Sequence, residues 1–388
     1  MVEQQAVTIQ EALDLAKNHH QKGWHREAEN ICRQVLETEP DNFFAYHQLG
    51  LIAVSTGNEE MAVNLISKAV TINPASPQAY YDLGVVFQRL GKLQDADASY
   101  RKAIDLKQDF SEALNNLGTV RRELGNISES IQCYRNAINV QDQYAAAHSN
   151  LGLALHDIGD FGEALSSFRK ALAINYDIAE VHYNLGTTLQ ALGRLSEAVE
   201  SFRLSLSLNP NIAAAHTNLG LALRDLGKWD EASDSYKSAI SINPDSAEAH
   251  HNLGMLQLLE GNYVDGWQNY GWRWKLRKRE CHPIALDKPL WDGTKANGKT
   301  IYVYSEQGLG DAIQFVRYLP LLKVEGYRVV LESPPSLKRL FQHSEVADEV
   351  IESGETPSPF DCHAALLDLP GLMRTTLQTI PSSSPYLN

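Results

Sequence analysis

One column of amide side chains recurs along the chain and has the chemistry to hold a polypeptide backbone. We call it the asparagine column, and its members are Asn116, Asn150, Asn184, Asn218 and Asn252. Each amide carries both a hydrogen-bond donor and an acceptor, which is the complement of a peptide group. Because asparagine is a mediocre helix former, five equally spaced copies in a helical context are unexpected unless they have a role.

The spacing of the column suits an extended peptide. Stacked helices repeat at roughly 10 Å, and an extended chain rises ~3.3 Å per residue. One asparagine would therefore lie opposite about every third residue of an extended segment of a partner protein. Gln48 and Asp82 occupy the two preceding places, so we expect binding to be strongest from Asn116 onward. The alternative is that these asparagines only cap or hydrogen-bond locally.

A column of histidines has the residue type, but not the spacing, for metal binding. It consists of His148, His182, His216 and His250. Copies roughly 10 Å apart cannot share one ion at ~2.0–2.1 Å per bond. Tyr46 and Tyr80 hold the same place earlier in the chain, so we predict core histidines and no metal site. The four cysteines include no CxxC pair and are expected to be isolated reduced thiols.

A glycine-rich turn in the C-terminal part is the second candidate site. It follows an apolar stretch typical of a strand and precedes a helical pattern, which is the usual ligand position in open α/β sheets. Its glycines would let the backbone approach an anion or a sugar. The candidate loop residues are Glu306, Gln307, Gly308 and Gly310, followed by Asp311. The spacing is not G-x-G-x-x-G, so the dinucleotide fingerprint is absent. Alternatively, Asp311 caps the helix and Glu306 is an ordinary strand-end carboxylate.

An internal repeat of 34 residues positions the asparagine column. A Leu-Gly pair recurs at this interval, and a second glycine follows seven positions later each time. The pairs begin at Leu49, Leu83, Leu117, Leu151, Leu185, Leu219 and Leu253. We expect two antiparallel helices per repeat, with the first glycine at their close approach and the second ending the first helix with φ > 0. A small residue and then an aromatic or large apolar one recur in the second helix, where we expect them to pack in the groove.

These positions resemble the tetratricopeptide repeat (TPR), as in Tyr80-x2-Leu83-Gly84-x2-Phe87 followed by Ala96-x3-Tyr100. The resemblance implies a mainly α fold, a right-handed TPR superhelix or α-solenoid. We predict a degenerate N-terminal repeat or cap over 1–42 and seven repeats over 43–280. The sequence also resembles the TPR superhelix of O-linked N-acetylglucosamine transferases. That resemblance implies that asparagines at this position line the inner surface and grip the backbone of the substrate.

After Cys281 the repeat disappears, and we predict a linker over 281–299 and a small Rossmann-like α/β domain over 300–388. Strands are expected at Thr300–Ser305, Arg328–Glu332, Glu349–Ile351 and Cys362–Leu367, and helices at Ala312–Val324 and Ser336–His343. Strands that alternate with helices indicate a parallel sheet. The aromatic and basic run over 266–279 is expected to attach the solenoid to this domain. The alternative, stacking on nucleobases, is less favoured.

The segments 289–293 and 306–322 resemble bacterial TPR proteins with a GT-B glycosyltransferase-like C-terminus, related to lipopolysaccharide heptosyltransferases. The resemblance implies that Asp311 is a candidate general base for an acceptor hydroxyl. A GT-B enzyme has two Rossmann domains, and about 105 residues hold only one. We therefore expect a fragment or truncated form, inactive as given. It would have no cofactor, and a nucleotide-sugar donor only where the second domain is present.

Composition excludes several classes of function. The 388 residues carry 34 Lys and Arg against 48 Asp and Glu, a net charge of −14. Such a surface repels phosphate backbones, so we expect no nucleic-acid partner. No stretch approaches the ~18 apolar residues that span a bilayer, and we expect a cytoplasmic protein. The predicted function is a protein–protein interaction module, with self-association left open. The alternative is a TPR scaffold or adaptor whose α/β remnant is a structural cap.

Overall fold

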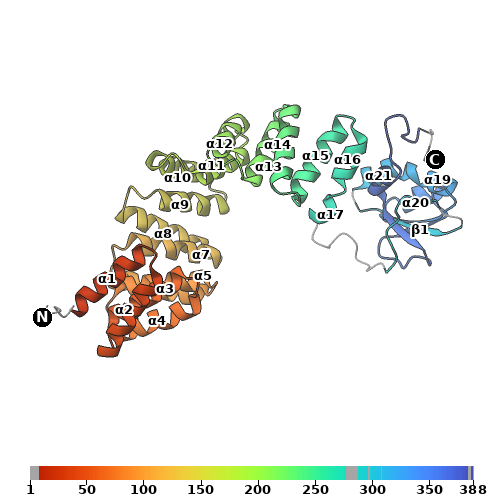
Figure 1. The fold of residues 1–388 in the computed structure, drawn as a ribbon. Coiled ribbons are helices and arrows are strands. Elements are labelled where there is room, and N and C mark those ends of the chain that lie inside the picture. The colour runs from red at the N-terminus through yellow and green to blue at the C-terminus, as the bar shows by residue number, and fades with distance from the viewer. Residues whose placement is uncertain (1–7, 277–286, 296–297, 307, 383–385, 388) are drawn as a thin grey trace. The chain divides into compact units, whose positions relative to one another are not determined.

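The computed structural model describes residues 8–276, 287–295, 298–306, 308–382 and 386–387. The chain divides into two compact units, residues 1–208 and 209–388, which are considered separately. Pairs of antiparallel helices follow one another along the first unit and continue into the second (Figure 1). None of the helices described here combines the length and the apolar character needed to cross a membrane.

The described residues of the first unit form twelve helices in six pairs. They are α1 (Ile9–Gln21), α2 (His25–Thr38), α3 (Phe43–Ser55), α4 (Glu59–Ile72), α5 (Pro77–Arg89), α6 (Leu93–Leu106), α7 (Ser111–Glu123), α8 (Ile127–Val140), α9 (Ala145–Asp157), α10 (Phe161–Ile174), α11 (Ala179–Ala191) and α12 (Leu195–Leu208). The predicted N-terminal repeat forms as α1 and α2. Thr8 starts it with a capping box, since its side chain accepts from the Glu11 N–H and the Glu11 side chain accepts from the Thr8 N–H.

The two glycines of each repeat do what their positions predict. The second glycine of every repeat has a φ between +71° and +84°, the left-handed conformation that ends the first helix. The first glycine lies where the two helices touch. A Cβ on Gly84, for example, would lie 2.7 Å from the ring of Tyr100. Only a hydrogen fits there, and the ring of Tyr100 is fully buried against the glycine.

The second unit begins with two more pairs and a short helix. These are α13 (Ala213–Asp225), α14 (Trp229–Ile242), α15 (Ala247–Leu259), α16 (Tyr263–Tyr270) and α17 (Arg273–Leu276). The helix α16 is shorter than its counterparts in the earlier repeats. Gly254 on α15 accordingly meets the backbone of Tyr270 at the end of α16, rather than an aromatic ring.

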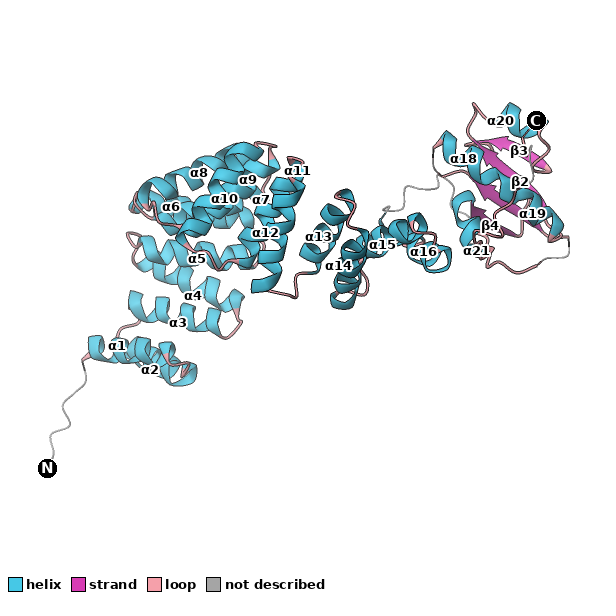
Figure 2. Cartoon of the chain, turned by 90° about the horizontal axis from the view of Figure 1, so that it is seen from above, coloured by secondary structure: helices cyan, strands magenta, loops and turns pink. Residues whose placement is uncertain are grey.

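A small parallel sheet follows, with four strands in the order β3-β2-β1-β4. The strands are β1 (Thr300–Tyr304), β2 (Arg328–Ser333), β3 (Glu349–Glu352) and β4 (Cys362–Ala365). Figure 2 shows them side by side with α18 (Leu309–Phe315), α19 (Leu319–Val324), α20 (Lys338–His343) and α21 (Leu369–Leu372) around them. Short 3-10 turns stand at Val316–Tyr318 and Leu366–Asp368.

Both faces of the sheet are buried. On one face Ile301 and Val303 pack against residues of α18, α19 and α20. On the other face Tyr302 and Tyr304 lie in a cluster that includes Trp274 from α17. This burial on both sides explains why the strands are continuous apolar runs rather than alternating patterns.

Three predicted boundaries were wrong. The helix expected over Ala312–Val324 begins earlier, at Leu309, and is interrupted by the 3-10 turn before Pro320. Proline has no N–H, and its ring clashes with the carbonyl four residues earlier. The strand expected to run to Leu367 ends at Ala365, where the chain turns toward Pro370. The helix expected from Ser336 begins at Lys338.

Part of the segment expected to be a linker is packed on the sheet. Trp291 is 5% exposed and belongs to the core of the α/β part. Its backbone N–H donates to the His363 carbonyl at 2.8 Å, and Leu290 forms an isolated parallel bridge with His363. This stretch therefore extends the sheet beyond β4. Residues 281–286 and 296–297 of the predicted linker lie outside the described residues.

Candidate functional sites

The asparagine column lies on the first helix of successive repeats. In the first unit Asn116, Asn150 and Asn184 lie on α7, α9 and α11, and each is half-buried. In the second unit Asn218 and Asn252 lie on α13 and α15 and are half-buried too. The side chains are thus neither core residues nor fully solvated ones.

Two of these amides are held by the preceding repeat. Asn150 Nδ2 donates to Asn115 Oδ1 at 3.0 Å, and Asn116 Nδ2 donates to the hydroxyl of Tyr81 at 3.2 Å. Asp82, which has the same place in its repeat, lies 2.8 Å from His47 Nε2. In all three cases the partner stands 35 residues earlier, on the neighbouring first helix. Local hydrogen bonding, the alternative left open by the sequence, is therefore part of what these residues do.

Such bonds also orient the amides. An asparagine has two N–H donors and a carbonyl oxygen with two lone pairs, so one bond to a neighbour leaves capacity for a ligand. Asn116 has less of this capacity left, because its Oδ1 also accepts a hydrogen bond from Asn115 Nδ2 at 3.2 Å. Of these two amides, Asn150 therefore keeps more hydrogen-bonding capacity for a backbone amide.

The histidine column joins adjacent repeats. In each case Nε2 lies within hydrogen-bond distance of a carbonyl oxygen six residues earlier, in the turn between repeats. The pairs are His148 with Asp142, His182 with Tyr176, His216 with Pro210 and His250 with Pro244. His148 and His182 are buried, whereas His216 and His250 are half-buried. Within the described part of the chain, no cluster of three or more His, Cys, Asp or Glu side chains could hold a metal ion.

The glycine-rich loop lies at the carboxyl end of β1. Gly308 is the N-cap of α18, and Asp311 is the third residue of that helix. The alternative that Asp311 is the capping residue is therefore wrong. Gly310 lies in the first turn, and a Cβ there would meet nothing within 4 Å, so the backbone at this point is accessible to a ligand. Gln307 lies outside the described residues.

Glu306, at the start of this loop, is buried and pairs with a residue of α17. Arg273 Nη2 lies 3.0 Å from Glu306 Oε1 and 2.8 Å from Asp368 Oδ1. Burial raises the pKa of the Glu306 carboxyl, and the guanidinium of Arg273 offsets part of that effect. Trp274 Nε1 donates to the same Asp368 at 3.0 Å. We call Arg273, Glu306 and Asp368 the buried triad. The predicted attachment by the aromatic and basic run is confirmed at Trp274, within the second unit.

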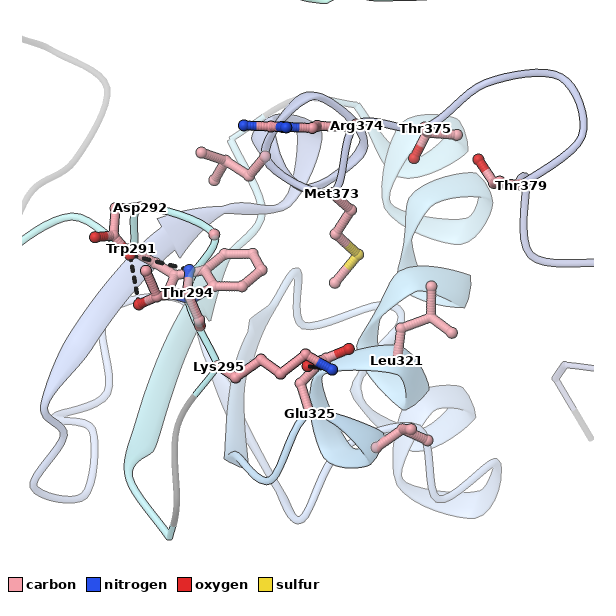
Figure 3. A pocket seen from close by; sticks show the side chains of 13 residues that line it. Trp291, Asp292, Thr294, Lys295, Leu321, Glu325, Met373, Arg374, Thr375 and Thr379 are labelled. Carbon is pink, nitrogen blue, oxygen red and sulfur yellow. Dashed lines mark hydrogen bonds and ion pairs between the residues drawn. The ribbon is translucent and has the colours of Figure 1, made fainter.

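The sequence did not single out one hollow of the α/β part. This cavity of about 510 Å³ is lined by residues before β1, on α19 and after α21. Figure 3 shows Met373 pointing into the space between Trp291 and Leu321. Lys295 and Glu325 form an ion pair of 2.9 Å at its rim. None of the predicted site residues from Glu306 to Asp311 lines it.

Comparison with known families decides the nature of the repeats. The TPR and tetratricopeptide repeat families match residues 45–76, 77–110, 109–177, 179–212 and 220–261, which is more than half of the chain. The chain belongs to the tetratricopeptide repeat family. Its TPR region is a protein–protein interaction module. The family matches end at residue 261, before the α/β part.

Solved structures give the same fold. A chain of the APC/C hetero-tetramer Cut9–Hcn1 has a TM-score of 0.53 at 19% identity, with 66% of this chain and 50% of that chain covered. A tetratricopeptide repeat protein from Parabacteroides merdae has a TM-score of 0.50 at 15% identity, with 64% and 98% covered. The pilF protein of Pseudomonas aeruginosa has a TM-score of 0.49 at 26% identity, with 53% of this chain and 94% of that chain covered. No curated protein matches the sequence.

Proposed function

We propose that the TPR region binds an extended segment of a partner protein along the asparagine column. The observation that carries this is the position of the Asn150 amide. It is half-buried on the first helix of its repeat, and a bond of 3.0 Å to Asn115 fixes one of its N–H groups. An oriented amide with a remaining donor and acceptor matches a peptide group of a bound chain.

The main-chain character of this recognition sets what the partner must offer. Bonds to peptide groups depend little on the partner's side chains, so the column contributes affinity more than sequence preference. The partner must therefore present a segment that is extended and not already paired in a sheet or helix. With a net charge of −14, the chain also disfavours strongly acidic segments.

The test uses peptides selected from a displayed random library against the whole chain. Replacing Asn116, Asn150 and Asn184 together with alanine should weaken the selected peptides by at least about tenfold, the loss of one or two good hydrogen bonds. Asn64, Asn136 and Asn139 lie on second helices, and their triple alanine variant is the matched control. Equal affinity for both variants at equal melting temperature would remove the column from the binding site.

A second candidate concerns the α/β part, and the order of its strands favours it. In an open parallel sheet the ligand crevice lies at the carboxyl ends of the strands where the order reverses, and the order β3-β2-β1-β4 places this point between β1 and β4. We propose a Rossmann-like first half of a glycosyltransferase-like domain there. Asp311 would act as general base on an acceptor sugar held at the loop by Gly308 and Gly310, whereas Glu306 is used in the buried triad and is not part of this site. A nucleotide-sugar would bind only with a second domain.

Saturation-transfer NMR with methyl glycosides tests this second proposal on the chain as it is. A glycoside signal that Asp311→Asn abolishes supports the assignment, and Asp361→Asn serves as a control at the other end of the sheet. A signal unchanged by Asp311→Asn removes the general-base role. If no glycoside gives a signal, the α/β part is a structural cap on the solenoid.

A further inference from the structure

The first helices of the first three pairs line a half-open pocket on the side that carries Gln48 and Asp82. This cavity of about 560 Å³ is lined by residues of α1, α3 and α5, all in the first unit. Gln48 and Asp82, the two residues that interrupt the asparagine column, both line it. We call it the N-terminal pocket. The pocket therefore lies at the end of the column where the sequence predicts the weakest binding to a peptide backbone.

Hydrogen-bond acceptors from three helices converge on the pocket. Gln10 Nε2 donates to Asp14 Oδ1 at 3.2 Å, Gln78 Nε2 donates to Asp82 Oδ1 at 3.1 Å, and Gln48 Nε2 contacts His20 Nδ1 at 2.7 Å. Each glutamine thus uses a donor inside the protein and keeps its carbonyl oxygen as an acceptor. Three amide oxygens and two carboxylates share one cavity.

The charge of the pocket favours a cation. Two carboxylates line it, those of Asp14 and Asp82, together with the ammonium group of Lys17 and the imidazole of His47. Asp82 is largely satisfied within the protein, since its Oδ2 lies 2.8 Å from His47 Nε2. Asp14 is exposed and has one side-chain bond, to Gln10. It is therefore the carboxylate best placed to pair with a charge from outside.

An aromatic ring completes the wall. Phe44 is 61% exposed, whereas Phe110, Phe168, Phe202 and Phe341 are buried. A solvent-facing ring beside carboxylates is a surface on which a planar cation can stack. The guanidinium of arginine stacks on aromatic faces more readily than an ammonium does, and its five donors can reach acceptors on separate helices.

We propose that the N-terminal pocket binds the side chain of an arginine in the extended segment that the TPR region holds. This inference rests on the proposed function, because the asparagine column would hold the backbone while the pocket selects one residue. The guanidinium stacks on Phe44, pairs with Asp14 and donates to the glutamine carbonyls. Lys17 opposes the bound cation and limits the affinity.

The experiment compares selected peptides with their citrulline counterparts, which keep the shape of arginine without its charge. A random 12-residue library displayed against the whole chain should enrich arginine at one register. Citrulline at that place should weaken binding by about tenfold, since charge-assisted bonds are roughly twice as strong as neutral ones. Phe44→Ala and Asp14→Asn should each lower the affinity for the arginine peptide to that for the citrulline peptide. Lys17→Ala should raise the affinity for the arginine peptide.

Matched controls separate this inference from the proposed function. Tyr176→Ala removes a ring of similar exposure, 55%, elsewhere in the first unit and should change nothing. Asn150→Ala with Asn184→Ala should weaken the arginine and citrulline peptides equally. Selected peptides without arginine, or citrulline peptides that bind as tightly, overturn the pocket assignment and leave the proposed function intact. A library that yields no binder at all refutes both.

Discussion

Arg273 and Glu306 form an ion pair of 3.0 Å in which their side chains are only 5% and 0% exposed. Arg273 begins α17 at the end of the repeats, and Glu306 follows β1 of the sheet. Asp368, after β4, pairs with the same guanidinium at 2.8 Å. The carboxyl ends of β1 and β4 are thus joined to the TPR part through one buried cation.

Removal of Arg273 should destabilise the second unit. A guanidinium that is lost from a buried pair leaves two carboxylates without their cation, and such a change costs about 3–5 kcal/mol. Urea unfolding of Arg273→Met, followed by the fluorescence of the tryptophans near the junction, measures this loss.

The triple variant Arg273→Met, Glu306→Gln, Asp368→Asn is the control for that measurement. It removes the charges together, so it should be more stable than Arg273→Met alone. If both variants unfold at the same urea concentration, the triad contributes packing and no charge pairing.

The surplus negative charge of the triad predicts how stability depends on pH. Burial raises the pKa of Glu306 in the folded state above its ordinary value. The folded state therefore binds more protons than the unfolded state, and this group's stabilising contribution is lost as pH rises through the folded pKa. Glu306→Gln removes that loss. As pH rises from 4, the melting temperature of the parent chain should fall relative to that of Glu306→Gln. If the two curves of melting temperature against pH run parallel, the prediction is wrong.

The two glycines of a repeat should respond to alanine for different reasons. In Gly84→Ala the new methyl meets the buried ring of Tyr100 at 2.7 Å, and overpacking of this kind costs about 1–3 kcal/mol. In Gly91→Ala there is open space, but φ is +71°, so the cost of about 1 kcal/mol comes from the backbone. Gly162 on α10 has neither constraint, and Gly162→Ala should stabilise by about 0.5–1 kcal/mol.

A smaller residue at position 100 distinguishes the two mechanisms. Tyr100→Ala should remove the cost of Gly84→Ala in a double-mutant cycle, because the clash is with that ring. It should leave the cost of Gly91→Ala unchanged. Urea titration of the parent chain, the three single variants and the two double variants gives the free energies of unfolding that decide between the mechanisms. Additive costs for Gly84→Ala and Tyr100→Ala would refute the packing explanation.

The repeat could be predicted from the sequence because each of its elements is local. The Leu-Gly pair, the second glycine and the later aromatic residue lie within one helix pair, so their spacing alone defines the contacts. The buried triad could not be found this way. Glu306 stands 33 residues from Arg273, and Asp368 lies beyond three further strands. Only the parallel sheet brings the ends of β1 and β4 together, and charged residues alone do not indicate which pairs become buried.

The N-terminal pocket shows a different limit. The sequence predicts the asparagine column, and it shows that Gln48 and Asp82 occupy the two preceding places. It does not show that Gln10, from the degenerate first repeat, faces them across one cavity. That arrangement depends on how α1 packs beside α3, and the repeat pattern does not specify this packing for the degenerate first repeat.

The histidine column should matter most where it is buried. In His182→Leu the carbonyl of Tyr176 loses its partner at 2.9 Å, and the loss of this bond to a buried side chain costs about 0.5–1.5 kcal/mol. His216 makes the equivalent bond to Pro210 at 3.0 Å but is half-buried, so water can replace it. His216→Leu should therefore cost less, and His182→Asn, which keeps a donor, should recover part of the loss. Urea unfolding of the three variants measures these costs, and equal losses for both leucine variants would show that the histidines act only by filling space.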